Sequence, residues 1–178
     1  DRGTGSGSAY LFTRSGTLWT QQQKLTAMDG AADDALGSSV SINGDMALVG
    51  AHKDADKGFQ SGSAYLFSRS GTTWTEQKKL TAKDGAAYDL FGSSVSVGGG
   101  MALVGAYGDD DKGSASGSAH FIGLCEGERY LKQNKLTAKG SDNLGWSVSL
   151  SGGMALVGAD DDDKGIYTGA AYLFSRNG

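Results

Sequence analysis

The sequence lacks several features on which whole classes of protein depend. It contains no proline and a single cysteine, Cys125, which excludes an internal disulfide framework and a cysteine-based metal cluster. A lone cysteine is usually a small buried apolar residue. No apolar run approaches the length of a membrane span, so we expect no membrane span. No charged-then-apolar leader opens the sequence, but Asp1 falls inside a repeat, so the missing leader excludes no compartment.

The chain is also short of basic charge. Its 16 Lys and Arg stand against 20 Asp and Glu, which gives a net charge of −4. No basic stripe with interleaved aromatic residues offsets this balance. Nucleic acid is therefore not an expected partner, because binding to phosphates depends on clustered Lys and Arg.

Glycine is what the chain has in excess. Thirty glycines, interleaved with Ser, Thr and Asp, indicate many tight turns and therefore many short strands. Apolar residues nowhere recur at the helical spacing over a dozen positions. With 38% hydrophobic and 20% charged residues, 178 residues are enough to bury a core. The predicted fold class is all-β.

A unit of 55 residues recurs along the chain. Close copies begin at Ser6, Ser61 and Ser116, and a partial copy begins at Thr168. Repetition at a fixed period of this length indicates a repeat architecture. The predicted domain is one array over 1–178, with repeats at 6–60, 61–115 and 116–167 and a partial fourth at 168–178. Both ends fall inside a repeat, which predicts a piece of a longer chain or of an assembly.

Each repeat holds four strand-like segments. "FGSSVSV", from Phe91 to Val97, alternates small or polar with apolar residues and is followed by a glycine-rich turn. "MALVGA" is continuous in small and apolar residues, as in a strand covered on both faces. "GSAYLFSR" and "TWTEQKKLTA" complete the set on either side of a turn at Ser70 and Gly71.

Four antiparallel strands with two apolar faces must stack against neighbouring sheets, and radial stacking gives a β-propeller. The segments read in order as two strands, four, four and three. This number cannot close a ring, so the expected structure is an incomplete propeller. Missing sequence or partner chains would have to close it, and a head-to-tail arrangement that does not close would make a filament.

A recurring pair of motifs resembles a known family. The motif "FG" or its variant precedes the first strand of each repeat and "GA" ends the second, as in the FG-GAP repeats of integrin-α-type β-propellers, in a style similar to bacterial and algal members. The residues that carry it are Leu36-Gly37 with Gly50-Ala51, Phe91-Gly92 with Gly105-Ala106, and Gly145 with Gly158-Ala159. The resemblance implies blades of a propeller and an extracellular or cell-surface location. It also implies a calcium loop between the first two strands, but here that connection has shrunk to "INGDM", "VGGGM" and "LSGGM". The usual calcium site is therefore not expected.

Aspartates gather instead in the loop between the second and third strands of each repeat. Calcium takes six to eight oxygens, which carboxylates at alternating positions and loop carbonyls can supply. The candidate calcium ligands are Asp54, Asp56, Asp109, Asp110, Asp111, Asp161, Asp162 and Asp163. The alternative is a solvated acidic turn, neutralised by the lysine that follows the last aspartate of each loop.

A second loop, before each "FG", carries further aspartates. Asp29 with Asp33, and Asp84 with Asp89, are candidates to bind a cation or a sugar hydroxyl. The simpler interpretation is that they form Asx-turns between blades. The third copy is three residues shorter and keeps only Asp142.

Aromatic residues that recur at the same position of successive repeats are expected to pack between blades. They are Trp19, Trp74 and Tyr130 at one repeat position, and Tyr10, Tyr65 and Tyr172 at another. Trp146 is off this pattern, since the other copies have serine there, and it is the candidate platform for a ligand.

Catalysis finds little support. The three glutamates, Glu76, Glu126 and Glu128, offer no pair placed for acid–base chemistry. His52 and His120 occupy different repeat positions, and His120 replaces the tyrosine of the other copies, which predicts a packed imidazole. We therefore expect no enzymatic activity. The predicted function is an extracellular structural or adhesive module that mediates protein contact or self-assembly, and calcium is the ion expected to stabilise it. The alternative is a lectin-like module that binds glycans between blades.

Overall fold

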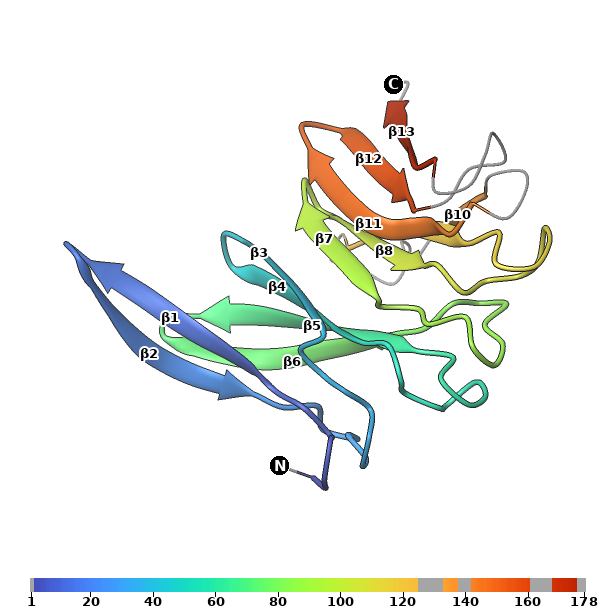
Figure 1. Ribbon diagram of the computed structural model, residues 1–178. Helices are drawn as coiled ribbons and strands as arrows, with labels where there is room; N and C mark the ends of the chain where they lie inside the picture. Colours follow the sequence, from blue (N-terminus) through green and yellow to red (C-terminus); the bar gives the residue numbers. More distant parts are fainter. Residues whose placement is uncertain (1, 125–132, 138–141, 161–167, 176–178) are drawn as a thin grey trace.

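The fold is a fan of antiparallel sheets. The computed structural model describes residues 2–124, 133–137, 142–160 and 168–175, and over these residues the chain forms thirteen strands. The strands make four sheets, which lie face to face and diverge toward one side (Figure 1). Among the described residues there is no helix, and so none that could cross a membrane.

We call the four sheets blades 1 to 4 in chain order. Blade 1 consists of β1 (Ala9–Ser15) and β2 (Leu18–Leu25). Blade 2 consists of β3 (Ser39–Asn43), β4 (Met46–Ala51), β5 (Ser63–Ser70) and β6 (Thr73–Leu80). Blade 3 consists of β7 (Ser94–Gly98), β8 (Met101–Ala106), β9 (Ser118–Gly123) and β10 (Gln133–Thr137). Blade 4 consists of β11 (Leu144–Ser151), β12 (Met154–Ala159) and β13 (Ala170–Ser175).

This arrangement confirms the all-β class and the order of two, four, four and three strands. Every neighbouring pair of strands is antiparallel, and the described strands do not close into a ring. A blade takes strands from two successive sequence repeats. Blade 2, for example, joins β3 and β4 of the first repeat to β5 and β6 of the second.

The shortened turns form as glycine permits. Gly44 and Gly99 open the two-residue turns before β4 and β8, with φ of 57° at each. That left-handed conformation matches the twist of a tight hairpin and costs glycine little. Asp45, which follows Gly44, accepts a hydrogen bond of 2.7 Å from Nε of Arg69 in β5.

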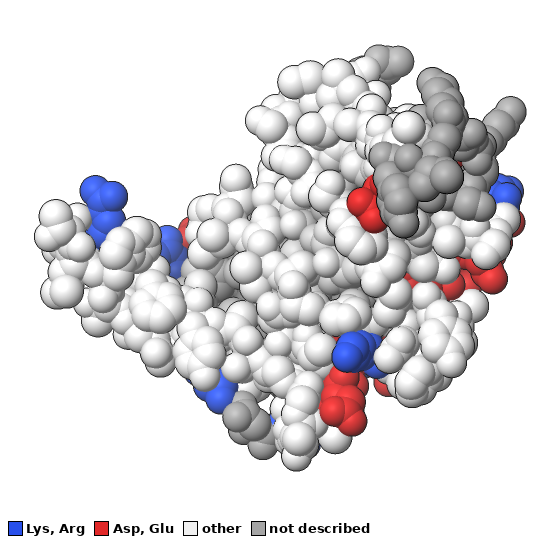
Figure 2. Space-filling view, viewed as in Figure 1, with Lys and Arg blue, Asp and Glu red and all other residues white. Residues whose placement is uncertain are grey.

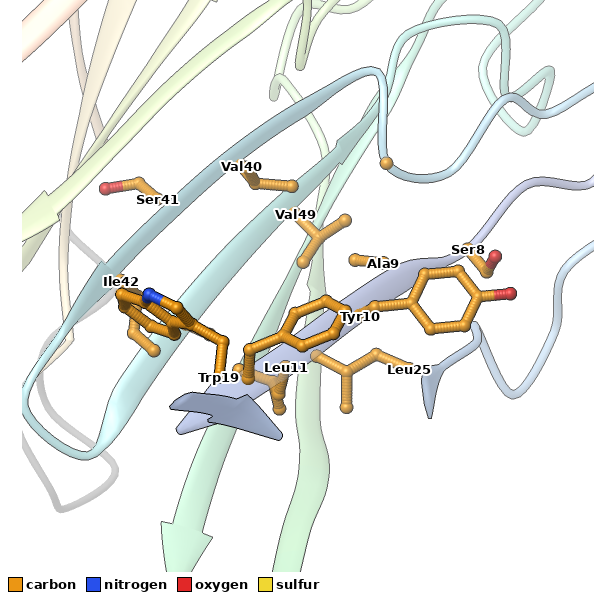
Figure 3. A pocket seen from close by; sticks show the side chains of 13 residues that line it. Ser8, Ala9, Tyr10, Leu11, Trp19, Leu25, Val40, Ser41, Ile42 and Val49 are labelled. Carbon is orange, nitrogen blue, oxygen red and sulfur yellow. The ribbon is translucent and has the colours of Figure 1, made fainter. Parts of the chain in front are cut away.

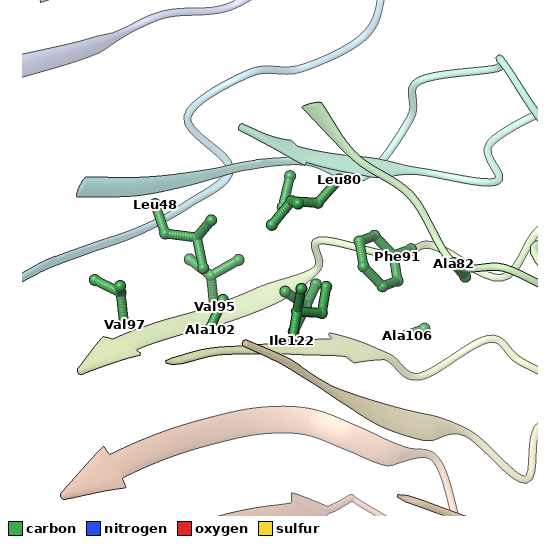
Figure 4. Packing of buried hydrophobic residues seen from close by; sticks show 11 residues of the cluster. Leu48, Leu80, Ala82, Phe91, Val95, Val97, Ala102, Ala106 and Ile122 are labelled. Carbon is green, nitrogen blue, oxygen red and sulfur yellow. The ribbon is translucent and has the colours of Figure 1, made fainter. Parts of the chain in front are cut away.

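The core lies between the blades and not inside them. Neighbouring residues of β4 point in opposite directions: Leu48 packs with Val95 and Val97 of blade 3, and Val49 packs with Leu25 of blade 1. Figure 4 shows the cluster between blades 2 and 3. The burial of both faces of "MALVGA" explains why this strand has no polar alternation.

The glycines of the two motifs meet across neighbouring blades. A Cβ atom on Gly50 would lie 2.0 Å from the carbonyl oxygen of Gly92, and one on Gly105 would lie 2.0 Å from that of Gly145. A serine two residues after the "FG" glycine also contributes, since Oγ of Ser94 donates a 2.7 Å hydrogen bond to the carbonyl oxygen of Gly145. The "GA" glycine of one blade therefore leaves room for the "FG" backbone of the next.

Candidate functional site

The acidic loop of blade 2 closes on a lysine side chain. Nζ of Lys79, in β6, lies 2.6 Å from Oδ2 of Asp54, 2.6 Å from Oδ2 of Asp56 and 2.9 Å from Oδ2 of Asp29. Asp29 comes from the connection between blades 1 and 2, so three separate segments meet at one ammonium group. The hydroxyl of Tyr65 lies 2.9 Å from Oδ1 of Asp29 and 3.1 Å from Oδ2 of Asp54, so its one proton is shared between the two carboxylates.

Blade 3 repeats the arrangement around Lys135 of β10. Its Nζ lies 2.5 Å from Oδ2 of Asp109, 2.6 Å from that of Asp111 and 2.8 Å from that of Asp84. In each loop one of the two paired aspartates is almost fully buried and the other is exposed. In blade 3, the side chain of Asp109 is 3% exposed and that of Asp111 is 52% exposed. We call each lysine with its three carboxylates an ammonium site.

Local backbone geometry fixes the buried aspartate. Oδ1 of Asp54 accepts a 3.0 Å hydrogen bond from the backbone N–H of Asp56, which is an Asx-turn. Oδ2 is then free to face Lys79. Burial lowers the pKa of Lys79, but the hydrogen bonds that its ammonium group donates to Asp54, Asp56 and Asp29 more than offset this effect, so the pKa lies above its usual value. The lysine is thus held in its charged form.

These contacts bear directly on the calcium expectation. Carboxylates of Asp54, Asp56, Asp109 and Asp111 converge on an ammonium group, which takes the central position that a cation would need. Within the described part of the chain, no three His, Cys, Asp or Glu side chains are arranged to hold a metal ion. The carboxylates around each lysine are therefore already paired with an ammonium group, and calcium binding by these loops stays a prediction.

The remaining candidate ligands are placed differently. Asp110 is exposed at the tip of its loop. Asp161, Asp162 and Asp163 lie outside the described residues. The alternative interpretation had each loop neutralised by the lysine that follows its last aspartate, whereas the ion pairs that the structure shows are made by Lys79 and Lys135. The signal that could have identified them is the motif "KLTA", which recurs in every copy.

The aspartates before each "FG" divide into two roles. Asp29 and Asp84 bind a cation, which is the lysine ammonium. Asp89 closes a turn of a different kind from the predicted Asx-turn, because its Oδ2 accepts a 2.7 Å hydrogen bond from the backbone N–H of Ala86, three residues earlier, and not from a residue two positions later. Burial, partly offset by that bond, raises the pKa of Asp89 to about 6. In the first copy the turn is made by Asp34, which accepts from Ala31, and not by the neighbouring Asp33 that the sequence analysis chose.

His120 is the packed imidazole that the sequence predicts. It replaces Tyr65 in the repeat, is 1% exposed, and packs edge-to-face on Phe91 with ring centroids 5.2 Å apart. Its Nε2 lies 2.9 Å from Oγ of Ser118 and its Nδ1 lies 3.0 Å from Nε2 of Gln133. Burial lowers the pKa of His120 to about 4.

His120 is therefore expected to make the protein sensitive to acid. Unfolded histidine has a pKa of about 6.5, so as the pH falls below this value the unfolded state binds a proton that the folded state does not bind. The free energy of unfolding should fall as pH drops from about 6.5 toward 4, and the contribution is fully present above that window. Urea unfolding of wild type against His120→Tyr/Phe91→Leu checks this, because the double variant restores the Tyr65 and Leu36 pair of the preceding repeat.

The double variant is the informative comparison because tyrosine alone, set against Phe91, is expected to overpack the site by about 1–3 kcal/mol. At pH 7.5 or above the two proteins should differ little, whereas at pH 5 the wild type should have lost more stability than the variant. Parallel pH profiles of the two proteins would contradict the assignment of the effect to His120.

A second candidate site is formed by the open faces of the terminal blades. Tyr10, Phe12 and Trp19 of blade 1 are exposed, although their repeat counterparts Tyr65, Phe67 and Trp74 are buried; Trp19 is 62% exposed and Trp74 is 7%. The expected packing of periodic aromatics between blades is thus seen in blade 2, where another blade covers them.

The same contrast holds for two other groups of apolar side chains. Val40 of β3 is 63% exposed while its counterpart Val95 is 8% exposed, and Ile42 is exposed like Val40. In blade 4, Met154, Leu156 and Leu173 are exposed at positions that the internal blades cover. Figure 2 shows most of the acidic side chains toward the loop end of the fan, whereas the blade 1 end is mostly white on this face, with a few Lys or Arg side chains.

Between blade 1 and β3 lies a cavity of about 500 Å³. It is lined along one side by β1 and along the other by β3 and β4, with Tyr10, Trp19, Val40, Ile42 and Val49 around it (Figure 3). In blade 2 the equivalent edge of β5 is covered by β4, which pairs with it along its length. The cavity thus marks the place of the strand that would pair with β1.

Trp146, the candidate ligand platform, lies in β11 and is half exposed. Its ring packs against Tyr107, with centroids 4.6 Å apart and planes tilted by 52°. The tryptophan therefore forms an aromatic pair at the surface, in the place where the other repeats have Ser38 and Ser93.

Comparison with known proteins agrees with this geometry. The family model for the FG-GAP repeat matches residues 19–67, 74–122 and 130–174. No curated protein gives a significant match. The matched segments make up most of the chain and contain the paired glycines that let successive blades approach. On these grounds the chain belongs to the FG-GAP repeat family.

Proposed function

We propose that this chain is a non-catalytic propeller module that acts by binding protein through its open blade faces. The observation that carries the proposal is the exposure of apolar side chains at repeat positions that are buried wherever a blade covers them. Contiguous exposed apolar surface of this kind typically marks a protein–protein interface. The location consistent with this role is the cell surface or the extracellular space, as for an adhesive or structural module.

The edge of β1 favours an extended segment as the bound element. β2 pairs with one edge of β1, and the other edge borders the cavity. An unpaired edge presents backbone N–H and C=O groups to any strand that can align with it, and the adjoining pocket selects the side chains. The strand that occupies this place in blades 2 and 3 has the sequence "MALVGA".

A peptide with the sequence "SGGMALVGAD", residues 151–160, tests the proposal. We expect saturable binding, reported by a blue shift of Trp19 fluorescence, because the peptide covers the cavity that this residue lines. Trp19→Phe should remove the signal, and Ile42→Lys should weaken binding. A scrambled peptide of the same composition is the control, and equal binding of the two peptides would sink the proposal.

Glycan binding is the second candidate. The observation in its favour is the half-exposed ring of Trp146 packed against the partly buried Tyr107, because an aromatic ring at a surface can stack on apolar ligand faces. A glycan array probed with wild type and with Trp146→Ser separates the candidates, since the protein-binding role predicts no sugar-specific signal.

A further inference from the structure

We propose that a chain of hydrogen bonds through His120 holds the connection between blades 2 and 3 at neutral pH and releases it when the imidazole ring gains a second proton. This chain, which we call the relay, runs from Asp109 through Ser118, His120 and Gln133 to the backbone N–H of Lys83. Lys83 lies in residues 81–93, which join β6 to β7. The relay therefore couples a buried ring to the segment that links two blades.

The donors and acceptors of the relay all point one way. The carboxylate of Asp109 can only accept, so the hydroxyl of Ser118, 2.7 Å away, donates to it. The hydroxyl oxygen then accepts from Nε2–H of His120 at 2.9 Å. Nδ1 carries no proton in the neutral ring and accepts from Nε2 of Gln133 at 3.0 Å. Finally, Oε1 of Gln133 accepts a 3.1 Å hydrogen bond from the backbone N–H of Lys83.

A second proton on His120 is incompatible with this order. Nδ1–H would then be a donor that faces the side-chain NH₂ group of Gln133, which is also a donor. If the amide of Gln133 turns over, Oε1 reaches Nδ1–H, but the NH₂ group then faces the N–H of Lys83. The ring is 1% exposed and depends on protein partners, whereas Lys83 is exposed and can bind water. The bond that is lost is therefore the one to Lys83.

Charged groups from three segments face His120. Asp109 and Asp111 come from the loop between β8 and β9, Asp84 comes from the connection, and Lys135 comes from β10. The carboxylates favour the charged ring and Lys135 opposes it, but burial outweighs the carboxylates and lowers the pKa of His120 to about 4. The relay is thus intact at pH 7 and changes state in acid.

Blade 2 has a tether at the same place, but it does not pass through a histidine. The backbone N–H of Met28, at the repeat position of Lys83, donates a 2.9 Å hydrogen bond to Oε2 of Glu76 in β6. Tyr65 occupies the position of His120. Both connections are therefore fastened to the outer strand of the following blade, and of these two only the connection before blade 3 is linked to a buried imidazole.

The connection that the relay holds also presents an exposed aromatic pair. Tyr88 packs edge-to-face on Phe59 with ring centroids 5.4 Å apart, and both side chains are exposed. Asp84, the residue after Lys83, binds the ammonium group of Lys135. Release of the N–H of Lys83 loosens the start of this segment, so acid is expected to alter a surface that is open to a partner.

Hydrogen exchange measured by NMR on the ¹⁵N-labelled chain tests the relay. We expect the protection of the Lys83 amide, relative to its intrinsic exchange rate at each pH, to fall by half at the midpoint of the His120 titration, at about pH 4. In His120→Tyr/Phe91→Leu, which keeps the titrating carboxyl groups of Asp84 and Asp89, this fall should be absent. An unchanged protection of Lys83 across the His120 titration, or an equal fall in the double variant, would overturn the proposal.

A second variant cuts the relay without touching the buried ring. Gln133→Met should leave His120 titrating while the Lys83 amide exchanges rapidly at every pH. Gln23→Met, the same change at the equivalent position of blade 1, is the matched control and should leave the response of Lys83 as in wild type. Protection of Lys83 that survives Gln133→Met would refute the relay. Loss of the folded spectrum before His120 titrates would refute it as well, because the release has to occur in the folded chain.

Discussion

Gly105→Ala is expected to destabilise the protein by about 3 kcal/mol or more, the upper range for overpacking in a core. A methyl group at this position would lie 2.0 Å from the carbonyl oxygen of Gly145 and 2.3 Å from Oγ of Ser94. The first of these atoms belongs to the backbone of the next blade, which cannot rotate away. Blades 3 and 4 would have to separate, and the change in the midpoint of urea unfolding measures the cost.

Gly98→Ala provides the matched control. This glycine lies in β7 of the same blade, and a Cβ there would meet its nearest atoms at 3.9 and 4.0 Å, which is ordinary contact. The backbone of both Gly98 and Gly105 is outside the left-handed region, so the two substitutions differ in steric clash and not in backbone strain. Similar stabilities of the two variants would contradict the role assigned to the motif glycine.

The fold followed from the sequence because its signals are local and repeated. "MALVGA" predicts a strand buried on both faces, and the structure places Leu48 against blade 3 and Val49 against blade 1. The order of the strands could be predicted by counting strand-like segments. The role of the motif glycines could not be predicted, because Gly105 and Gly145 lie 40 residues apart and meet only when the blades stack.

The ammonium sites show that the sequence of a loop does not by itself identify the charge that its aspartates bind. The acidic loops were correctly located, and the alternation of Asp54 and Asp56 does aim two carboxylates at one point. The charge that they face, Lys79, lies in β6, whereas the lysine nearest to them in sequence lies in the loop itself. A periodic lysine in a strand is ordinarily interpreted as a solvated residue, and only pairing with β5 brings it beside the loop.

Lys79→Met is expected to destabilise the protein by about 3–5 kcal/mol, which is the cost of leaving a buried charge without its partner. The side chain of Lys79 is 17% exposed and that of Asp54 is 3% exposed, so water does little to compensate either charge. Lys78→Met is the control, since this neighbouring lysine of β6 is exposed. If the two variants unfold at the same urea concentration, the ammonium site contributes nothing.

A second variant separates loss of charge from loss of packing. The double variant Lys79→Met/Asp54→Asn should recover part of the stability that Lys79→Met loses, because it removes the unpaired buried charge. A packing defect would not be recovered in this way.

The single variant Lys79→Met also shows whether the lysine ammonium occupies the position that a bound cation would take. With the ammonium in place the carboxylates are already paired, so the thermal midpoint of wild type should be unchanged between EDTA and millimolar calcium. In Lys79→Met the carboxylates of Asp29, Asp54 and Asp56 converge on a vacated position, and binding of calcium there would stabilise the folded state by mass action. We therefore expect calcium to raise the midpoint of the variant alone. A rise in wild type that Lys79→Met abolishes would mean that the lysine supports a cation site instead of replacing one.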